Sequence, residues 1–395
     1  MQRSIGGLYV ETQNVVPVIL GGLGRPPIGR MWLQLTLVAV LLALVCGVIS
    51  NQTASKLDIL PRFTSEVFTA FDTPITIIGH ASSEAEFSRL ASLAQERYLK
   101  LHMLFDIYNS YPGLTNLKDI NDQAGGEALR VDPDILSLLS LAKEGYLISG
   151  GLVDITLGPV LEIWHVLRVQ ALAGLDVSLP SNSELGAALA LRGIRDVELD
   201  FAAQTVRLAR EGMSLNVGAV AKGYATEQVV NLLCSEGFEA GLIDAGGHIR
   251  VIGQPMDGQR TKWGVGIQDP EKYAWISGSP EERMLDAVFV ADTSVVSSGD
   301  YQRYFYVEDQ RYHHIIDPRT GYPATQYQAV TVEYRDSGWA DLLSTAVFLL
   351  SPDEALAVAE EHGFALYLLP QEGPAITNSA MQSILQSEGA TARDP

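Results

Sequence analysis

Residues 197–208 read VELDFAAQTVRL, and this stretch decides the fold class. Val197–Asp200 and Thr205–Leu208 have the pattern of two strands, and the four residues between them are enough for a hairpin turn. The strands of a hairpin run antiparallel. Short strands with Gly-rich turns continue from residue 240 to 334. The sequence therefore predicts one large mixed domain of α+β class, with an antiparallel sheet and flanking helices.

The flanking helices are predicted from the residues at their ends. Ser83 with Glu86 and Ser181 with Glu184 form capping boxes that begin two helices, and Asp132 caps a third. Further helices are expected at residues 159–164, 218–236, 340–350 and 352–361.

The charge of the chain limits its partners. Its 395 residues include 27 Lys and Arg against 47 Asp and Glu, for a formal net charge of −20. Contacts to nucleic acid need Lys and Arg, so nucleic acid is excluded as the main partner. A nucleotide substrate stays open, because a bound cation can screen phosphates locally. The two cysteines have no disulfide or zinc pattern, and Cys234 is expected to be a small core residue of a helix.

The N-terminal part contains one long apolar segment. Residues 31–50, MWLQLTLVAVLLALVCGVIS, carry no charge and are about as long as a membrane-spanning helix requires. Arg25 and Arg30 precede the segment, so the positive-inside rule places the body on the extracytoplasmic face of a bacterial membrane. A lipoprotein-type signal at Cys46 and a buried core helix are the alternatives. The expected organisation is a disordered leader at 1–30, the anchor or signal at 31–50, a tether at 51–70, the folded domain at 71–386 and a polar tail at 387–395.

Two histidines stand in the motif HHIIDPRTG, residues 313–321. They end a predicted strand, so alternation points His313 and His314 to opposite faces. One of them can then face a site while the other faces solvent. The alternative is a plain hairpin turn with surface histidines, since Asp-Pro and Thr-Gly are typical of turns.

Two further motifs lie on predicted helices. In ADLLSTA, residues 340–346, Asp341 and Thr345 share one helix face, where a carboxylate and a hydroxyl can bind a hard cation such as Mg²⁺. In NVGAVAKGY, residues 216–224, small residues at a helix start allow a phosphate to approach, and Lys222 adds a positive charge. An ordinary first-turn Asp and a structural Gly-rich helix start are the respective alternatives.

Taken together and in this order, these motifs resemble the FAD:protein FMN transferases of the ApbE family. The resemblance covers about residues 71–369. The other segments that carry it are YPGLTNLKDIN at 111–121, GLVDITLGPVLEIW at 151–164 and SGDYQRY at 298–304. Phe71 and Asn216 stand where many members have Met and Asp.

The resemblance implies roles for single residues. Asp341, Thr345 and the backbone carbonyl of Ala219 match metal-binding positions and are oxygen donors, as Mg²⁺ prefers. His314 matches a catalytic position, and Asp300 is a second candidate. The positions expected to contact FAD are Phe71, Tyr111, Leu152, Val153, Asp154, Asn216, Lys222, Ser298 and Gly299.

The implied reaction is Mg²⁺-dependent transfer of FMN from FAD to a Ser or Thr hydroxyl of an acceptor protein, with release of AMP. The expected acceptor is a subunit of a membrane redox complex that carries a short motif around that Ser or Thr. Two alternatives stay open. One is a Mg²⁺-dependent FAD pyrophosphatase with water as the nucleophile, and the other is a membrane-tethered FAD-binding protein without catalysis.

Overall fold

The computed structural model describes residues 59–272 and 283–393. The chain divides into two units, residues 1–57 and 58–395, and the description below concerns the second. Within the described ranges, every helix is too short or too polar to cross a membrane. The expected leader, the segment at 31–50 and the first part of the tether lie outside the described residues.

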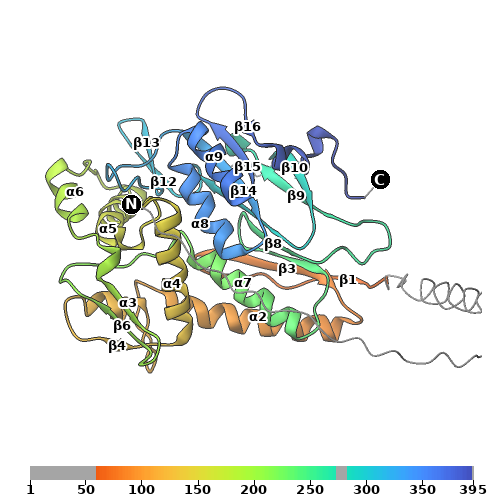
Figure 1. Ribbon diagram of the computed structural model, residues 1–395, viewed down its shortest axis with the longest axis horizontal. Coiled ribbons are helices and arrows are strands. Elements are labelled where there is room, and N and C mark those ends of the chain that lie inside the picture. The colour runs from red at the N-terminus through yellow and green to blue at the C-terminus, as the bar shows by residue number, and fades with distance from the viewer. Residues whose placement is uncertain (1–58, 273–282, 394–395) are drawn as a thin grey trace, which may run out of the picture. The chain divides into compact units, whose positions relative to one another are not determined.

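A nine-stranded antiparallel sheet forms the centre of the fold (Figure 1). Each pairing in it is antiparallel, which confirms the predicted α+β class. Along the sheet the order is β1 (Arg62–Thr64), β3 (Thr73–His80), β7 (Gly241–Asp244), β8 (His248–Ile252), β11 (Ser294–Gly299), β14 (Tyr327–Tyr334), β15 (Ala365–Pro370) and β16 (Ile376–Thr377), with β2 (Phe68–Ala70) paired to β3.

Three smaller sheets surround the central one. The predicted hairpin is confirmed, because β5 (Val197–Asp200) pairs with β6 (Thr205–Leu208), and β4 (Leu129–Arg130) joins β6. Gln204 turns the chain with a φ of +55°. The other two sheets are hairpins, formed by β9 (Trp263–Gln268) with β10 (Met284–Val290) and by β12 (Tyr304–Val307) with β13 (Gln310–His313).

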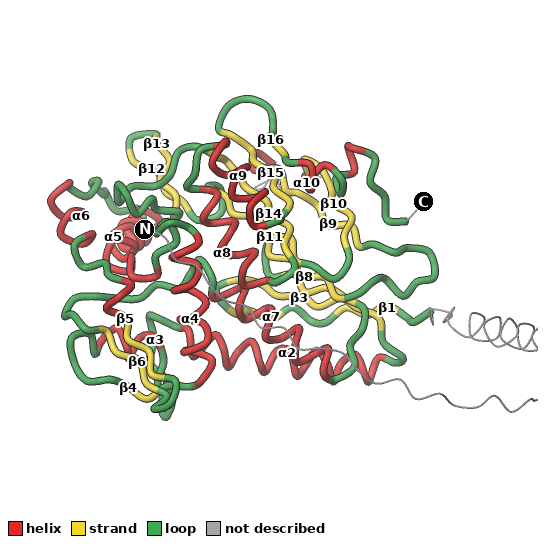
Figure 2. The backbone as a smooth tube through the Cα atoms, viewed as in Figure 1, coloured by secondary structure: helices red, strands yellow, loops and turns green. Residues whose placement is uncertain are grey.

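The helices begin where their caps predict. Ser83 accepts a hydrogen bond from the backbone of Glu86, and Ser181 forms a full capping box with Glu184. The helices are α2 (Glu84–Phe105), α3 (Leu117–Asp122), α4 (Pro133–Ile148), α5 (Gly158–Leu172), α6 (Asn182–Leu189), α7 (Ala221–Ser235), α8 (Ser337–Phe348), α9 (Pro352–His362) and α10 (Ser379–Gln382) (Figure 2).

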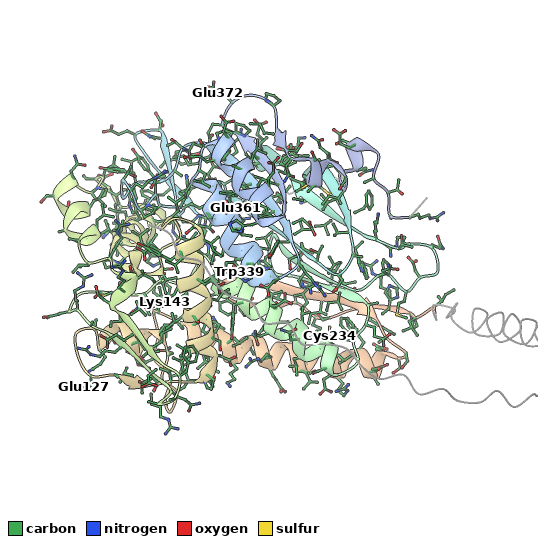
Figure 3. All side chains as sticks on the ribbon, in the orientation of Figure 1. Glu127, Lys143, Cys234, Trp339, Glu361 and Glu372 are labelled. Atoms are coloured by element: carbon green, nitrogen blue, oxygen red, sulfur yellow. The ribbon has the colours of Figure 1, made fainter. Side chains whose placement is uncertain are left out.

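The central sheet has an apolar core on each face. Val251 and Ile252 are neighbours on β8, yet they belong to different buried clusters, because successive side chains of a strand point to opposite faces. The cluster of Ile252 includes residues of α2 and α7, and that of Val251 includes residues of β9 and β10. Cys234 was expected in the core but is exposed on α7 (Figure 3), because it follows the buried Leu233 by one residue and points away from the sheet.

The folded body extends beyond both predicted boundaries. Residues 62–70 were expected to be tether, but they form β1 and β2 on β3, and Phe63 and Phe68 pack against the core. At the other end, residues of the expected polar tail are held by hydrogen bonds. Ser387 binds the carboxylate of Asp286, and the carbonyl of Ala392 accepts from the amides of Thr261 and Lys262. The polar composition of this segment predicted a free tail, but hydrogen bonds, including those to the Ala392 carbonyl, attach it to the folded body.

Candidate active site

A cavity of about 1070 Å³ lies where α7 and α8 meet the ends of several loops. Its volume is at the upper end of the range for ligand pockets. Twelve of the predicted site residues line it: Phe71, Leu152, Val153, Asp154, Asn216, Ala219, Lys222, Ser298, Gly299, His314, Asp341 and Thr345. The cavity thus gathers residues that lie far apart in the sequence, from Phe71 to Thr345.

The carboxylate of Asp341 occupies one corner of this cavity. Only 6% of the residue is exposed, and its Oδ2 accepts a hydrogen bond of 2.8 Å from the backbone N–H of Gly223 on α7. The two helices approach closely there, because a Cβ on Gly223 would lie 2.6 Å from the Cβ of Asp341. Thr345 lies one turn further along α8, and its Oγ1 donates to the carbonyl of Asp341 at 3.3 Å. The predicted pairing of Asp341 and Thr345 on one helix face is therefore present.

These residues suit a magnesium ion. Asp341, Thr345 and the carbonyl of Ala219 offer oxygen only, and all three residues line the cavity. Among the described residues, no group of three or more His, Cys, Asp or Glu side chains could hold a metal. Mg²⁺ typically takes one or two carboxylates and completes its shell with water and substrate phosphates. The single carboxylate of Asp341 beside a large cavity is consistent with this mode of Mg²⁺ coordination.

Positive charges stand close to this carboxylate. Lys222 lines the cavity; burial lowers its pKa, while the charge of Asp341 opposes that shift. Burial alone would raise the pKa of Asp341, but His248, Lys222 and the Gly223 amide together hold it below its usual value. Arg168 and Arg303 also line the cavity. In a chain with a net charge of −20, this gathering of cations favours an anionic ligand such as a pyrophosphate.

Polar residues along the cavity wall hold loops in place. Asp154 caps the short 3₁₀ helix at Ile155–Leu157, and its Oδ1 accepts from the amide of Thr156 at 2.8 Å. The Oδ1 of Asn216 accepts from the amide of Gly218 at 3.0 Å, beside the start of α7. Ser298 exchanges a hydrogen bond of 2.8 Å with Ser344 of α8. These bonds fix the cavity wall before any ligand binds.

The two histidines of the turn motif differ in their surroundings. His313 is buried at 5% exposure, and its Nε2 lies 2.6 Å from the carbonyl of Ala324. The expectation that the second histidine faces solvent was wrong, because the strand is covered on that side by α8, whose Phe348 meets His313 edge-on. His314 is exposed toward the cavity. The surrounding walls, and then the charge of Arg303, lower its pKa to about 3, so its ring is neutral.

A protein-family model described as the ApbE family matches residues 71–368. The chain belongs to the ApbE family. The FAD:protein FMN transferase of Treponema pallidum (strain Nichols) is 35% identical over 271 residues, which cover 65% of this chain and 71% of the relative. That of Klebsiella pneumoniae (strain 342) is 29% identical over 290 residues, covering 73% and 83%. The crystal structure of the ApbE protein from Thermotoga maritima is 27% identical, with a TM-score of 0.70 over 82% of this chain and 98% of that one.

Two predicted residues of this ApbE-family chain lie outside the cavity wall. Asp300 is 1% exposed, and its Oδ2 is bound by Arg311 and by Gln371, so its carboxylate is sealed away from a substrate. The hydroxyl of Tyr111 donates to Asp106 at 2.7 Å, and Tyr111 is absent from the cavity wall. The structure therefore does not bring Asp300 or Tyr111 to the cavity wall, unlike the other twelve predicted site residues.

Several residues on or behind the cavity wall were not predicted from the sequence. Tyr108 lines the cavity and is half-exposed, with its ring 5.1 Å from that of His165. It lies in the same loop as Tyr111, and neighbouring tyrosines in one loop cannot be told apart by the local pattern. Arg303 stood inside the quoted SGDYQRY segment, and its charge was the available signal. His248 stands behind the carboxylate of Asp341, and a single histidine after Gly-Gly carried no signal.

Proposed function

We propose that this protein is a Mg²⁺-dependent FAD:protein FMN transferase. The observation that carries the proposal is the convergence of Asp341, Lys222 and His314 on one cavity large enough for a dinucleotide. The names of the curated relatives support the same activity. The acceptor would be a protein with a reactive Ser or Thr in a short motif, and we propose a subunit of a membrane redox complex.

Some residues of the site would bind the phosphates of FAD, and His314 would act on the acceptor hydroxyl. Asp341, Thr345 and the Ala219 carbonyl would hold Mg²⁺, which offsets the negative charge of the pyrophosphate when bound. Lys222 and Arg303 would bind the remaining phosphate oxygens. The acceptor oxygen forms a bond to the phosphorus on the FMN side, the bond from that phosphorus to the bridging oxygen breaks, and AMP leaves. The hydroxyl proton passes to His314.

A neutral His314 has a free lone pair that can accept that proton. Its lowered pKa means that the ring stays unprotonated at pH values where an ordinary histidine, with a pKa of 6.5, would already be charged. We therefore expect the acidic limb of kcat/KM against pH to fall well below pH 6.5. His314→Gln should lower kcat by about 10²- to 10⁴-fold, the usual contribution of a general base.

The pH profile and the His314→Gln variant together test the role of His314 as the base. Transfer rates with fixed acceptor and Mg²⁺ would be measured from pH 4 upward, with His80→Gln as the control for a buried histidine away from the cavity. Full activity in His314→Gln would exclude His314 as the base. An acidic limb at the ordinary histidine pKa would show that the ring is not held neutral by its surroundings.

The proposed activity is tested with the full-length chain in detergent, FAD, Mg²⁺ and a candidate acceptor. Intact mass and in-gel flavin fluorescence of the acceptor should show the addition of one FMN. An acceptor with its Ser or Thr changed to Ala is the matched control and should gain nothing. Free FMN and AMP without acceptor labelling would favour the pyrophosphatase. FAD retained without any product would favour a binding protein.

We also propose that residues 31–50 tether the enzyme to a membrane with its body on the extracytoplasmic face. The support is the uncharged segment and the arginines before it. A tether would bring the enzyme close to acceptors in the same membrane. Cell fractionation should place the chain in the membrane fraction, with the body accessible to protease from outside. A body protected from that protease would contradict the proposed orientation, and mass analysis of the mature N-terminus would separate a spanning anchor from lipidation.

A further inference from the structure

A buried histidine stands behind the carboxylate of Asp341. His248, the first residue of β8, has 0% exposure and is absent from the cavity wall. Its Nδ1 lies 3.8 Å from the Oδ1 of Asp341. That distance is too long for a hydrogen bond, so the contact is electrostatic. Within the described residues, the buried Nδ1 has no hydrogen-bond partner.

The other ring nitrogen is held by a serine. The Nε2 of His248 lies 2.5 Å from the Oγ of Ser337, the first residue of α8. Ser337 is itself fixed, because its backbone N–H donates to Glu227 of α7 at 2.9 Å, and Glu227 also accepts from Arg250 at 3.2 Å. The ring therefore bridges the central sheet and the start of the helix that carries Asp341.

The surroundings select one tautomer of His248. A neutral imidazole carries a single N–H. With the proton on Nε2, the lone pair of Nδ1 would face the carboxylate of Asp341, which is repulsive. With the proton on Nδ1, its N–H dipole points toward that carboxylate, and Nε2 accepts from the hydroxyl of Ser337. The second arrangement satisfies both contacts.

We infer that His248, held by Ser337 with its proton on Nδ1, is a positioning residue that orients the Asp341 carboxylate for a divalent cation. The Gly223 amide holds Oδ2, and the N–H of His248 directs Oδ1. A carboxylate with a hydrogen bond at one oxygen and an N–H dipole facing the other loses less freedom when it binds a metal, and such outer partners commonly raise metal affinity. This inference rests on the proposed function, since it takes Asp341 to be the metal ligand.

Two amide variants test the roles of the two ring nitrogens of His248 one at a time. The amide of Asn can replace Nδ1, and the amide of Gln can replace Nε2. His248→Asn keeps a donor toward Asp341 and should bind Mg²⁺ within about threefold of the wild type. His248→Gln loses that donor and should bind Mg²⁺ about 10- to 100-fold more weakly. Ser337→Ala removes the hydroxyl that fixes the tautomer of His248, so this variant should also bind Mg²⁺ more weakly.

The experiment uses the full-length chain in detergent and Mg²⁺ alone as the probe. The dependence of the unfolding temperature on Mg²⁺ concentration reports affinity without catalysis. Unfolding temperatures without metal show whether each variant is folded. His80→Asn is the control, because His80 is a buried histidine of β3 that lies outside the cavity wall. In transfer assays, the apparent KM for Mg²⁺ should rise in His248→Gln while kcat at saturating Mg²⁺ largely recovers.

The outcomes distinguish the inference from the function on which it rests. Wild-type affinity in a folded His248→Gln would overturn the inference alone, and so would equal losses in the Asn and Gln variants, since those indicate a packing role. A wild-type chain that shows no response to Mg²⁺ would overturn the proposed metal site and the inference with it.

Discussion

Asp341→Asn should lower the rate of FMN transfer by about 10²- to 10³-fold. The variant keeps the shape of the side chain and an oxygen for the Gly223 amide, but it removes the carboxylate that we propose as a Mg²⁺ ligand. Charge stabilisation by a bound metal contributes several kcal/mol, and each 1.36 kcal/mol is a factor of ten in rate. Initial rates from acceptor mass, taken across a range of Mg²⁺ concentrations, measure the loss.

Asp336→Asn is the matched control for this variant. Asp336 caps the same helix by accepting from the amide of Trp339, and Asn caps helices about as well as Asp. The control removes the same charge outside the cavity wall, so its transfer rate should stay near that of the wild type. If Asp341→Asn kept more than half of the wild-type rate, Asp341 would not be the metal ligand.

Gly223→Ala should both destabilise the protein and lower its rate of FMN transfer. A Cβ at this position would lie 2.3 Å from the carbonyl oxygen of Ser337 and 2.6 Å from the Cβ of Asp341, so α7 and α8 must move apart. Overpacking of this kind costs about 1–3 kcal/mol of unfolding free energy. The amide that holds Oδ2 of Asp341 moves with α7, so FMN transfer should fall as well.

A glycine in open space provides the control. Nothing lies within 4 Å of a Cβ built on Gly186 in α6, so Gly186→Ala should be neutral or stabilising by up to about 1 kcal/mol. Urea denaturation of both variants gives the unfolding free energies, and the acceptor assay gives their rates. Equal stability of Gly223→Ala and the wild type would show that the two helices can separate without cost.

The turn between β5 and β6 shows why parts of the fold were readable from sequence. Strand pairing across a short turn depends on neighbouring residues, and so do the caps at Ser83, Asp132 and Ser181. The ends of the domain were misjudged for a different reason. β1 owes its place to pairing with β3, and Ala392 owes its place to the amides of residues 261 and 262.

The candidate site also has parts that were predictable from local sequence and parts that were not. Asp341 and Thr345 share a helix face, so their spacing alone predicted that they lie together. Asp300 stands two residues after Ser298, and both were expected in the site. The structure places Ser298 against Ser344 of α8 and binds the Asp300 carboxylate to Arg311 and Gln371 instead. Proximity in a motif does not reveal which side chains face a ligand once the strand has ended.

The sequence by itself determined the antiparallel α+β class, the starts of the helices capped by Ser83, Asp132 and Ser181, and the ApbE-family motifs, because each depends on residues a few positions apart. Only the tertiary structure decided which groups surround the carboxylate of Asp341. Gly223 meets Asp341 across 118 residues of chain, and His248 meets Ser337 across 89. These contacts exist because α7 and α8 pack together beside β8 of the central sheet, and that packing depends on the summed burial of many side chains, which no local pattern specifies.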